Sequence, residues 1–143
     1  MNTKELDFLN NEIGGLISAY SSLGSDFKDI DRLIVAKRKL SGYIYRFSVL
    51  VGESLEDYNN ASSDRKVFLA QRQLEILDNG STQFKANLMA EAESIELRKI
   101  ENISEAIYRR VKSQFDSCSD ILQSIMQDIS TLKKELENVK SDN

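Results

Sequence analysis

The residues of this chain best suited to chemistry are cations with aromatic side chains among them. From Arg32 to Arg46 the chain has five cations, two tyrosines and no acidic residue. These residues are Arg32, Lys37, Arg38, Lys39, Tyr43, Tyr45 and Arg46. Because cations bind phosphate and aromatic rings stack on unpaired bases, this composition is typical of a surface for single-stranded nucleic acid. The alternative interpretation is the solvated face of a helix, with Tyr43 or Tyr45 packed in the core.

Other kinds of site find less support in the residue types. The chain has no histidine, the residue most often used as a general base or a metal ligand. Glu53, Glu56 and Asp57 form an acidic cluster, but carboxylate metal sites in helical bundles also use histidine. Cys118 lies on an apolar helical seam, where a small core residue is expected. We therefore predict a protein that is not an enzyme and that uses no metal and no cofactor.

Size and composition indicate one helical domain. The chain has 143 residues, of which 41% are hydrophobic and 29% are charged, and its net charge is −4. Since the whole chain is acidic, any nucleic-acid site must be a local basic patch. A single cysteine excludes an internal disulfide, and neither a signal peptide nor a membrane-spanning run is visible, so we expect a cytoplasmic location.

The elements that must position these residues are helices. Proline is absent, and apolar residues recur at helical spacing on both sides of a single clear turn around Gly80. The pattern predicts an all-α chain with a short helix at 3–20 and two long helices at 26–77 and 82–139. The steps from Cys118 to Val139 alternate between four and three residues, which is coiled-coil spacing. The polar segment 57–66 is read as helix, with a loop as the alternative.

Two long helices joined by a short turn predict an antiparallel helical hairpin. Such a hairpin has a thin core, and apolar surface left on one face favours self-association, so we expect a homo-oligomer. Ile121 and Met126 lie beside the main seam and indicate a further helix packed there. That helix is either the segment 3–20 or part of another copy of the chain.

Pairing residues equally far from Gly80 brings the basic segments together. Arg46 then lies near Gln114, so that the cations of the third helix join those of the second in one basic belt. The cations added in this way are Arg109, Arg110 and Lys112. Together with the cations between 37 and 46 and the two tyrosines, they form the predicted nucleic-acid site.

The same pairing places acids opposite other cations. Arg65 falls within reach of Glu93 and Glu96, and Arg72 falls close to Glu91. Ion pairs of this kind stabilise an exposed seam by only about 0–1 kcal/mol each, although they help to set its register. Arg65 and Arg72, with Lys66, are therefore interpreted first as structural residues.

From Tyr43 to Glu135 the order of features resembles the small phage recombination-mediator proteins of the UvsY-like family. The matching pieces are Tyr58 with Arg65-Lys66, the turn Asn79-Gly80-Ser81-Thr82, Lys85-Ala86, Ala90-Glu91-Ala92-Glu93, and Tyr108-Arg109-Arg110 leading into the segment 116–125. The resemblance implies a ring-forming homo-oligomer that binds single-stranded DNA and helps to load a recombinase onto strands covered by single-strand-binding protein. It implies DNA contacts at Arg65 and Lys66, with Arg72 as a further candidate. The chain departs from the family pattern in the neighbouring acids Asp57 and Asp64.

The leading hypothesis is therefore a non-enzymatic, phage-type recombination accessory that binds single-stranded DNA. Two other classes stay open. One is a helical protein that binds and inhibits a host defence enzyme, and the other is a structural coiled-coil assembly protein. Binding to an oligonucleotide that weakens steeply with salt distinguishes the first hypothesis from the others.

Overall fold

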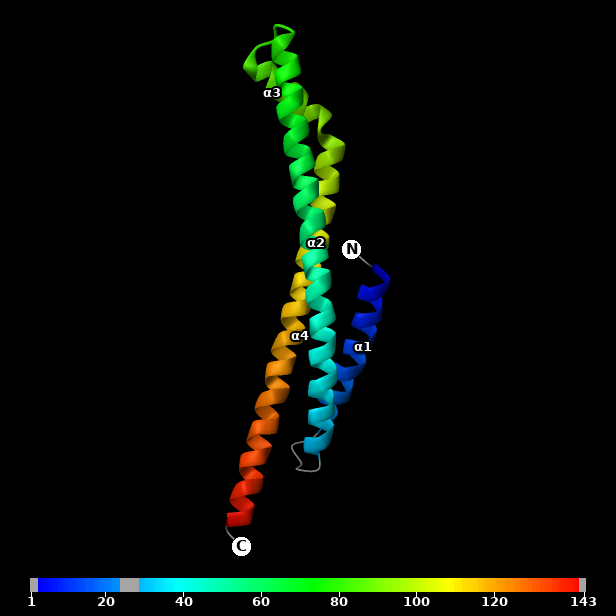
Figure 1. The fold of residues 1–143 in the computed structure, drawn as a ribbon, viewed down its shortest axis with the longest axis vertical. Helices are drawn as coiled ribbons and strands as arrows, with labels where there is room; N and C mark the ends of the chain where they lie inside the picture. The colour runs from blue at the N-terminus through cyan, green and yellow to red at the C-terminus, as the bar shows by residue number, and fades with distance from the viewer. Residues whose placement is uncertain (1–2, 24–28, 142–143) are drawn as a thin grey trace. The chain divides into compact units, whose positions relative to one another are not determined.

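The computed structural model describes residues 3–23 and 29–141. They form four α-helices, named α1 (Thr3–Ser21), α2 (Ile30–Asp78), α3 (Gln83–Glu93) and α4 (Ile95–Ser141), and no strand (Figure 1). The all-α prediction is confirmed. Residues 26–28, where the second helix was predicted to begin, lie outside the described part, whereas the polar segment 57–66 is helical throughout. No helix within the described ranges has a stretch long and apolar enough to cross a membrane.

The described residues fall into two compact units. The central unit is Val51–Val111, and the terminal unit combines the described residues of Asn2–Leu50 with those of Lys112–Asn143. Both boundaries lie inside helices, so α2 and α4 each contribute to both units.

The turn in the central unit follows from one glycine. Gly80 has a φ of 82°, a conformation that glycine adopts without steric cost. Its N–H donates to the carbonyl of Leu77 at 2.8 Å, and the N–H of Ser81 donates to the carbonyl of Ile76 at 3.3 Å. This pair of bonds is the Schellman motif, which satisfies carbonyls left open at the end of α2. Thr82 then caps α3 by accepting a hydrogen bond from the backbone N–H of Lys85.

The predicted continuous helix over 82–139 is corrected at one residue, because Ser94 separates α3 from α4. The Ser94 hydroxyl donates to the carbonyl of Glu91 at 2.9 Å, and its N–H is shared between the carbonyls of Ala90 and Glu91. A serine that bonds to the preceding turn in this way competes with the regular helical ladder. Its side chain is fully buried, so the interruption occurs inside the unit.

The core of the central unit is thin. Its main cluster contains Ile76, Ala86 and Ala90, with Leu69 and Leu77 packed against it. Small alanines allow the end of α2 to lie closely beside α3, and Figure 1 shows the start of α4 continuing along α2. Many large apolar side chains remain exposed to solvent in this unit. They are Leu55, Val67, Leu74, Phe84, Leu88, Met89, Ile95, Ile100, Ile103 and Ile107.

The core of the terminal unit draws on three helices. The buried residues are Leu6, Leu9 and Ile13 from α1, Leu33, Leu40, Phe47 and Leu50 from α2, and Cys118, Ile125, Ile129 and Leu132 from α4. The positions from α4 all belong to the seam predicted from the sequence, whereas Val139 at the end of that seam is exposed. A small cavity between α1 and α4, lined by Ile17, Cys118 and Ile121 among others, shows that α1 packs beside this seam within its own chain.

Candidate nucleic-acid interface

Three neighbouring cations on the first half of α2 have no ion pair with any described residue. They are Lys37, Arg38 and Lys39, of which Arg38 and Lys39 are exposed and Lys37 is half-buried. Tyr45 lies seven residues after Arg38 and is 73% exposed. Seven residues make two helical turns, so Arg38 and Tyr45 share a face. A ligand on this face can contact both the Arg38 guanidinium and the exposed Tyr45 ring.

Tyr43 and Arg46 are engaged by α1 instead. The Tyr43 hydroxyl donates to Glu12 Oε2 at 2.7 Å, and the carboxylate raises the pKa of the Tyr43 phenol. Arg46 Nη2 lies 2.6 Å from Glu5 Oε1. The Arg46 guanidinium also lies 4.8 Å from the centre of the Phe8 ring, in a cation–π contact. These two side chains therefore join α1 to α2.

The sequence signal for this contact lies in the first helix, and the prediction of the site did not use it. Glu5, Phe8 and Glu12 are three and four residues apart, so they share one face of α1. The apolar residues Leu6, Leu9 and Ile13 of α1 are buried beside that face. A helix with acids and a phenylalanine next to its apolar stripe matches a partner helix that carries tyrosine and arginine.

Arg65 makes ion pairs inside the central unit. Its Nε lies 2.5 Å from Glu101 Oε2 and its Nη1 lies 3.9 Å from Glu91, and its side chain is only 20% exposed. The Ser62 hydroxyl, together with the cations Arg65 and Lys66, lowers the pKa of the Glu101 carboxyl. The contacts agree with the structural interpretation of Arg65, and a DNA contact at Arg65 or at the exposed Lys66 stays a prediction.

Arg72 forms the second cross-helix ion pair of the central unit. Its guanidinium donates to Glu93 from Nε at 2.5 Å and from Nη2 at 3.1 Å, in a two-point contact. This contact lowers the pKa of Glu93 and raises that of Arg72. Tyr58 and Tyr108 stack farther from the turn, with ring centres 6.4 Å apart. Together these pairs show that α2 runs antiparallel to α3 and the start of α4 within this unit.

The register of these pairs corrects the one obtained by counting from Gly80. Counting placed Arg65 beside Glu93 and Glu96, whereas Glu101 and Glu91 are its partners. Counting likewise placed Arg72 near Glu91, whereas it binds Glu93. The short α3 follows four connecting residues and ends at Glu93, before the break at Ser94, so the two arms are not equally spaced from Gly80.

The cations predicted on the third helix belong to different units. Arg109 pairs with Glu105 at 2.6 Å in the central unit, and Lys112 pairs with Asp116 at 2.9 Å in the terminal unit. Arg110 is exposed and forms no ion pair with another described residue. Since Arg46 lies in the terminal unit, a continuous belt from Arg46 to Arg110 stays a prediction.

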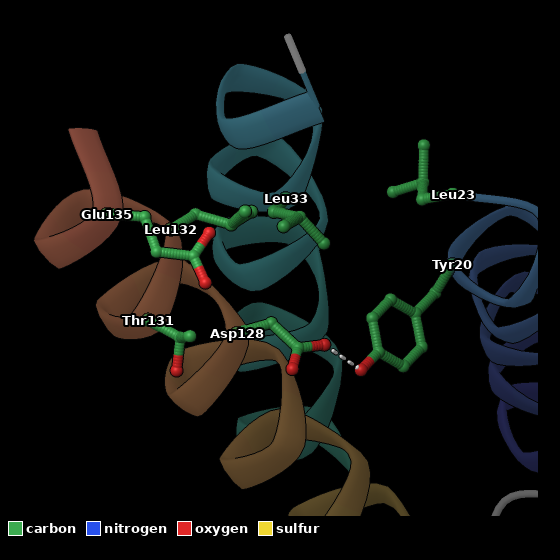
Figure 2. A pocket seen from close by; sticks show the side chains of 7 residues that line it. All are labelled: Tyr20, Leu23, Leu33, Asp128, Thr131, Leu132 and Glu135. Atoms are coloured by element: carbon green, nitrogen blue, oxygen red, sulfur yellow. Dashed lines mark hydrogen bonds between the residues drawn. The ribbon is translucent and has the colours of Figure 1, made fainter. Parts of the chain in front are cut away.

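The terminal unit also contains a small cavity of about 240 Å³ near the end of α1 (Figure 2). Tyr20 points across it, and its hydroxyl donates to Asp128 Oδ2 on α4. The bond to this carboxylate, with partial burial, raises the pKa of Tyr20 to about 12. Because Asp128 and Glu135 line the cavity, their charges disfavour a phosphate group there.

Reactive and metal-binding groups are sparse. Burial raises the pKa of the Cys118 thiol, which disfavours the nucleophilic thiolate. Over residues 3–23 and 29–141, acidic residues and the cysteine nowhere gather in a group of three that could hold a metal ion. In comparisons with known proteins, no family model, no curated protein and no solved structure matches this chain.

Proposed function

We propose that this protein is a non-enzymatic binding protein for single-stranded DNA, of the kind that assists recombination. The observation that carries the proposal is the group Lys37, Arg38 and Lys39, which has no acidic partner among the described residues, beside the exposed Tyr45. We call these four residues the α2 basic site, in which Arg38 and Tyr45 share one face of the helix and Lys37 and Lys39 lie on either side of it. Cations neutralised within the protein offer little to phosphate, whereas these remain available for it.

The contacts of the other predicted residues narrow the proposed site. Arg46 and Tyr43 are held by Glu5 and Glu12, and Arg65 is held by Glu101 and Glu91. If Arg46 or Arg65 bound a phosphate instead, these contacts with carboxylates would be broken. We therefore expect the α2 basic site to contribute more to DNA affinity than Arg46 or Arg65.

In this proposal the DNA strand follows α2 at its exposed side. Arg38 binds a phosphate, and Tyr45 on the same face stacks on a base two helical turns away. Lys37 and Lys39 add positive charge on either side of Arg38. Such a site is insensitive to sequence, because each base presents an aromatic face. It suits a mediator that must bind any strand on which a recombinase is loaded. The proposal includes a long antiparallel hairpin and a homo-oligomer, which would place several such faces along one strand.

The test compares two triple variants with the same change in charge. One replaces Lys37, Arg38 and Lys39 by glutamine, and the other replaces the exposed α4 cations Lys133, Lys134 and Lys140. Affinity for a fluorescent polythymidine strand is measured by anisotropy over a range of salt concentrations. The first variant should bind more weakly, and the slope of log affinity against log salt should fall by about 2. No binding at low salt by the native chain, or equal losses in both variants, would overturn the proposal.

A second function is favoured by a separate observation. The exposed apolar side chains of the central unit, Phe84, Leu88 and Ile95 among them, are of the kind found where proteins bind one another. This surface supports a helical inhibitor of a host defence enzyme, or a structural coiled-coil assembly protein. Binding to another protein that persists at high salt, with no affinity for DNA, would favour this class.

A further inference from the structure

One face of α4 in the central unit presents a row of isoleucines to solvent. Ile100, Ile103 and Ile107 are 53%, 60% and 38% exposed. They are spaced by three and four residues, so their side chains lie in one line along the helix. Glu101 and Tyr108, which face α2, lie on a different side of the same helix. The exposed surface of the isoleucine row therefore lies to the side of the contact that Glu101 and Tyr108 make with α2.

Opposite charges stand at the two ends of this row. Glu96 lies four residues before Ile100, and Arg110 lies three residues after Ile107, so both continue the same line. Each is seven residues from Ile103. The Glu96 side chain is 78% exposed and contacts Lys99, and Arg110 has no ion pair within the described part of the chain. The line of side chains therefore runs from an acid through three isoleucines to a base, and Ile103 lies at its centre.

We propose that this face, from Glu96 to Arg110, binds the same face of a second copy of the chain in antiparallel orientation. With a two-fold axis at Ile103, each residue opposes the one equally far on the other side. Glu96 of one copy then meets Arg110 of the second copy, and the contact occurs twice. A parallel pairing would instead bring Glu96 to Glu96 and Arg110 to Arg110, which is unfavourable.

The extent of the surface predicts the character of the association. The row is about 20 Å long, since an α-helix rises 1.5 Å per residue. Three isoleucines and two charges per copy make a contact smaller than a standard stable interface of about 800 Å² per partner. We expect an association that depends on protein concentration. A two-fold contact closes at two copies, whereas a ring needs a head-to-tail contact.

This inference rests on the self-association in the proposed function and is independent of DNA binding. Its first test is the mass in solution of the native chain and of Ile103→Glu, over a range of concentrations. A carboxylate at the centre of the row should weaken the association by about tenfold or more. Leu74→Glu is the matched control, because Leu74 is 62% exposed on α2 in the same unit. The control should associate as the native chain does.

Charge exchange tests the orientation. Glu96→Arg alone and Arg110→Glu alone each place like charges opposite each other, so both should weaken the association several-fold. The double variant restores opposite charges and should recover the native association. This recovery also shows that the single variants are not simply misfolded. Two weak single variants with no recovery in the double variant would overturn the antiparallel arrangement.

Cross-linking tests the position of the axis. Ile103→Cys should form a disulfide between copies under a mild oxidant, because the two side chains meet at the axis. Asn102→Cys is the control, since it is exposed but lies on another face of α4. If the chain is an oligomer that is unchanged by Ile103→Glu and does not cross-link in the Ile103→Cys variant, the proposed surface is wrong although the chain self-associates. A native chain that is monomeric at every concentration would overturn self-association as well, and oligonucleotide affinity would still report separately on DNA binding.

Discussion

Arg65 on α2 and Glu101 on α4 form a guanidinium–carboxylate contact of 2.5 Å, with both side chains largely covered. Replacing Arg65 by glutamine leaves the carboxylate without its main cation. We expect the free energy of unfolding to fall by about 1 kcal/mol. Urea denaturation measures the change. Lys66→Gln is the control, because Lys66 is exposed and adjacent, and its loss should change stability by less than about 0.5 kcal/mol. Equal effects of the two variants would contradict a structural role specific to Arg65.

The Glu101 carboxylate also predicts how the stability of the fold depends on pH. Glu101 has a lowered pKa because of the Ser62 hydroxyl and the nearby cations Arg65 and Lys66. A carboxyl whose pKa is lower in the folded chain stabilises the fold above its unfolded value of about 4.3, and this stabilisation is lost as the pH falls through the folded value. The native chain should therefore lose more stability than Glu101→Gln when the pH is lowered from neutral to below about 4. If the stability of the two proteins falls equally as the pH is lowered, this prediction is wrong.

Two glycines of the central unit should respond in opposite directions to the same substitution. Gly52 lies inside α2, and a Cβ there would meet no atom within 4 Å. Gly52→Ala should stabilise the chain by about 0.5–1 kcal/mol, since alanine loses less backbone entropy in a helix. Gly80 has equal space but a φ of +82°. Gly80→Ala should destabilise the chain, because a Cβ is strained in that conformation. Thermal unfolding of both variants gives the comparison.

The phenol of Tyr20 should titrate at a much higher pH than the phenol of an ordinary tyrosine. Its hydrogen bond to Asp128 raises its pKa to about 12. Because the folded pKa is the higher one, the stabilisation is complete below about 10, the unfolded value, and is lost as the pH rises through the folded value. The difference in ultraviolet absorbance between the native chain and Tyr20→Phe isolates this phenol. Asp128→Asn should lower the titration midpoint, and an unchanged midpoint would show that the carboxylate is not the cause.

Phe8 should help to hold α1 against α2 in the terminal unit. Its ring contacts the Arg46 guanidinium and lies edge-on to Tyr43, with ring centres 6.5 Å apart. Phe8→Ala removes both contacts, so the amide protons of α1 should exchange with deuterium several-fold faster. Val49→Ala is a suitable control, because Val49 is also exposed and lies on α2. If hydrogen exchange in α1 is unchanged, the attachment of α1 to the rest of the terminal unit depends on Leu6, Leu9 and Ile13 and not on Phe8.

The helices and the turn were predictable because their causes are local. The apolar spacing sets the period of each helix, and Gly80 supplies the positive φ that the turn requires. Cys118, Ile125, Ile129 and Leu132 lie in the core, as their coiled-coil spacing predicted. The position of α1 was not predictable, because an apolar stripe shows that a helix must be covered without showing by which chain.

The partners of the cations were decided by the tertiary structure. Ser94 interrupts the last helix through a hydrogen bond to Glu91, and a buried serine resembles an exposed one in sequence. The register of α2 against α4 follows from this break and from the close packing of Ala86 and Ala90, so Arg65 meets Glu101. Arg46 and Tyr43 are paired with α1, while Lys37, Arg38 and Lys39 are not paired with any described residue. A charge pattern specifies which residues can bind phosphate, but only the packing of helices distant in sequence determines which of them are already neutralised.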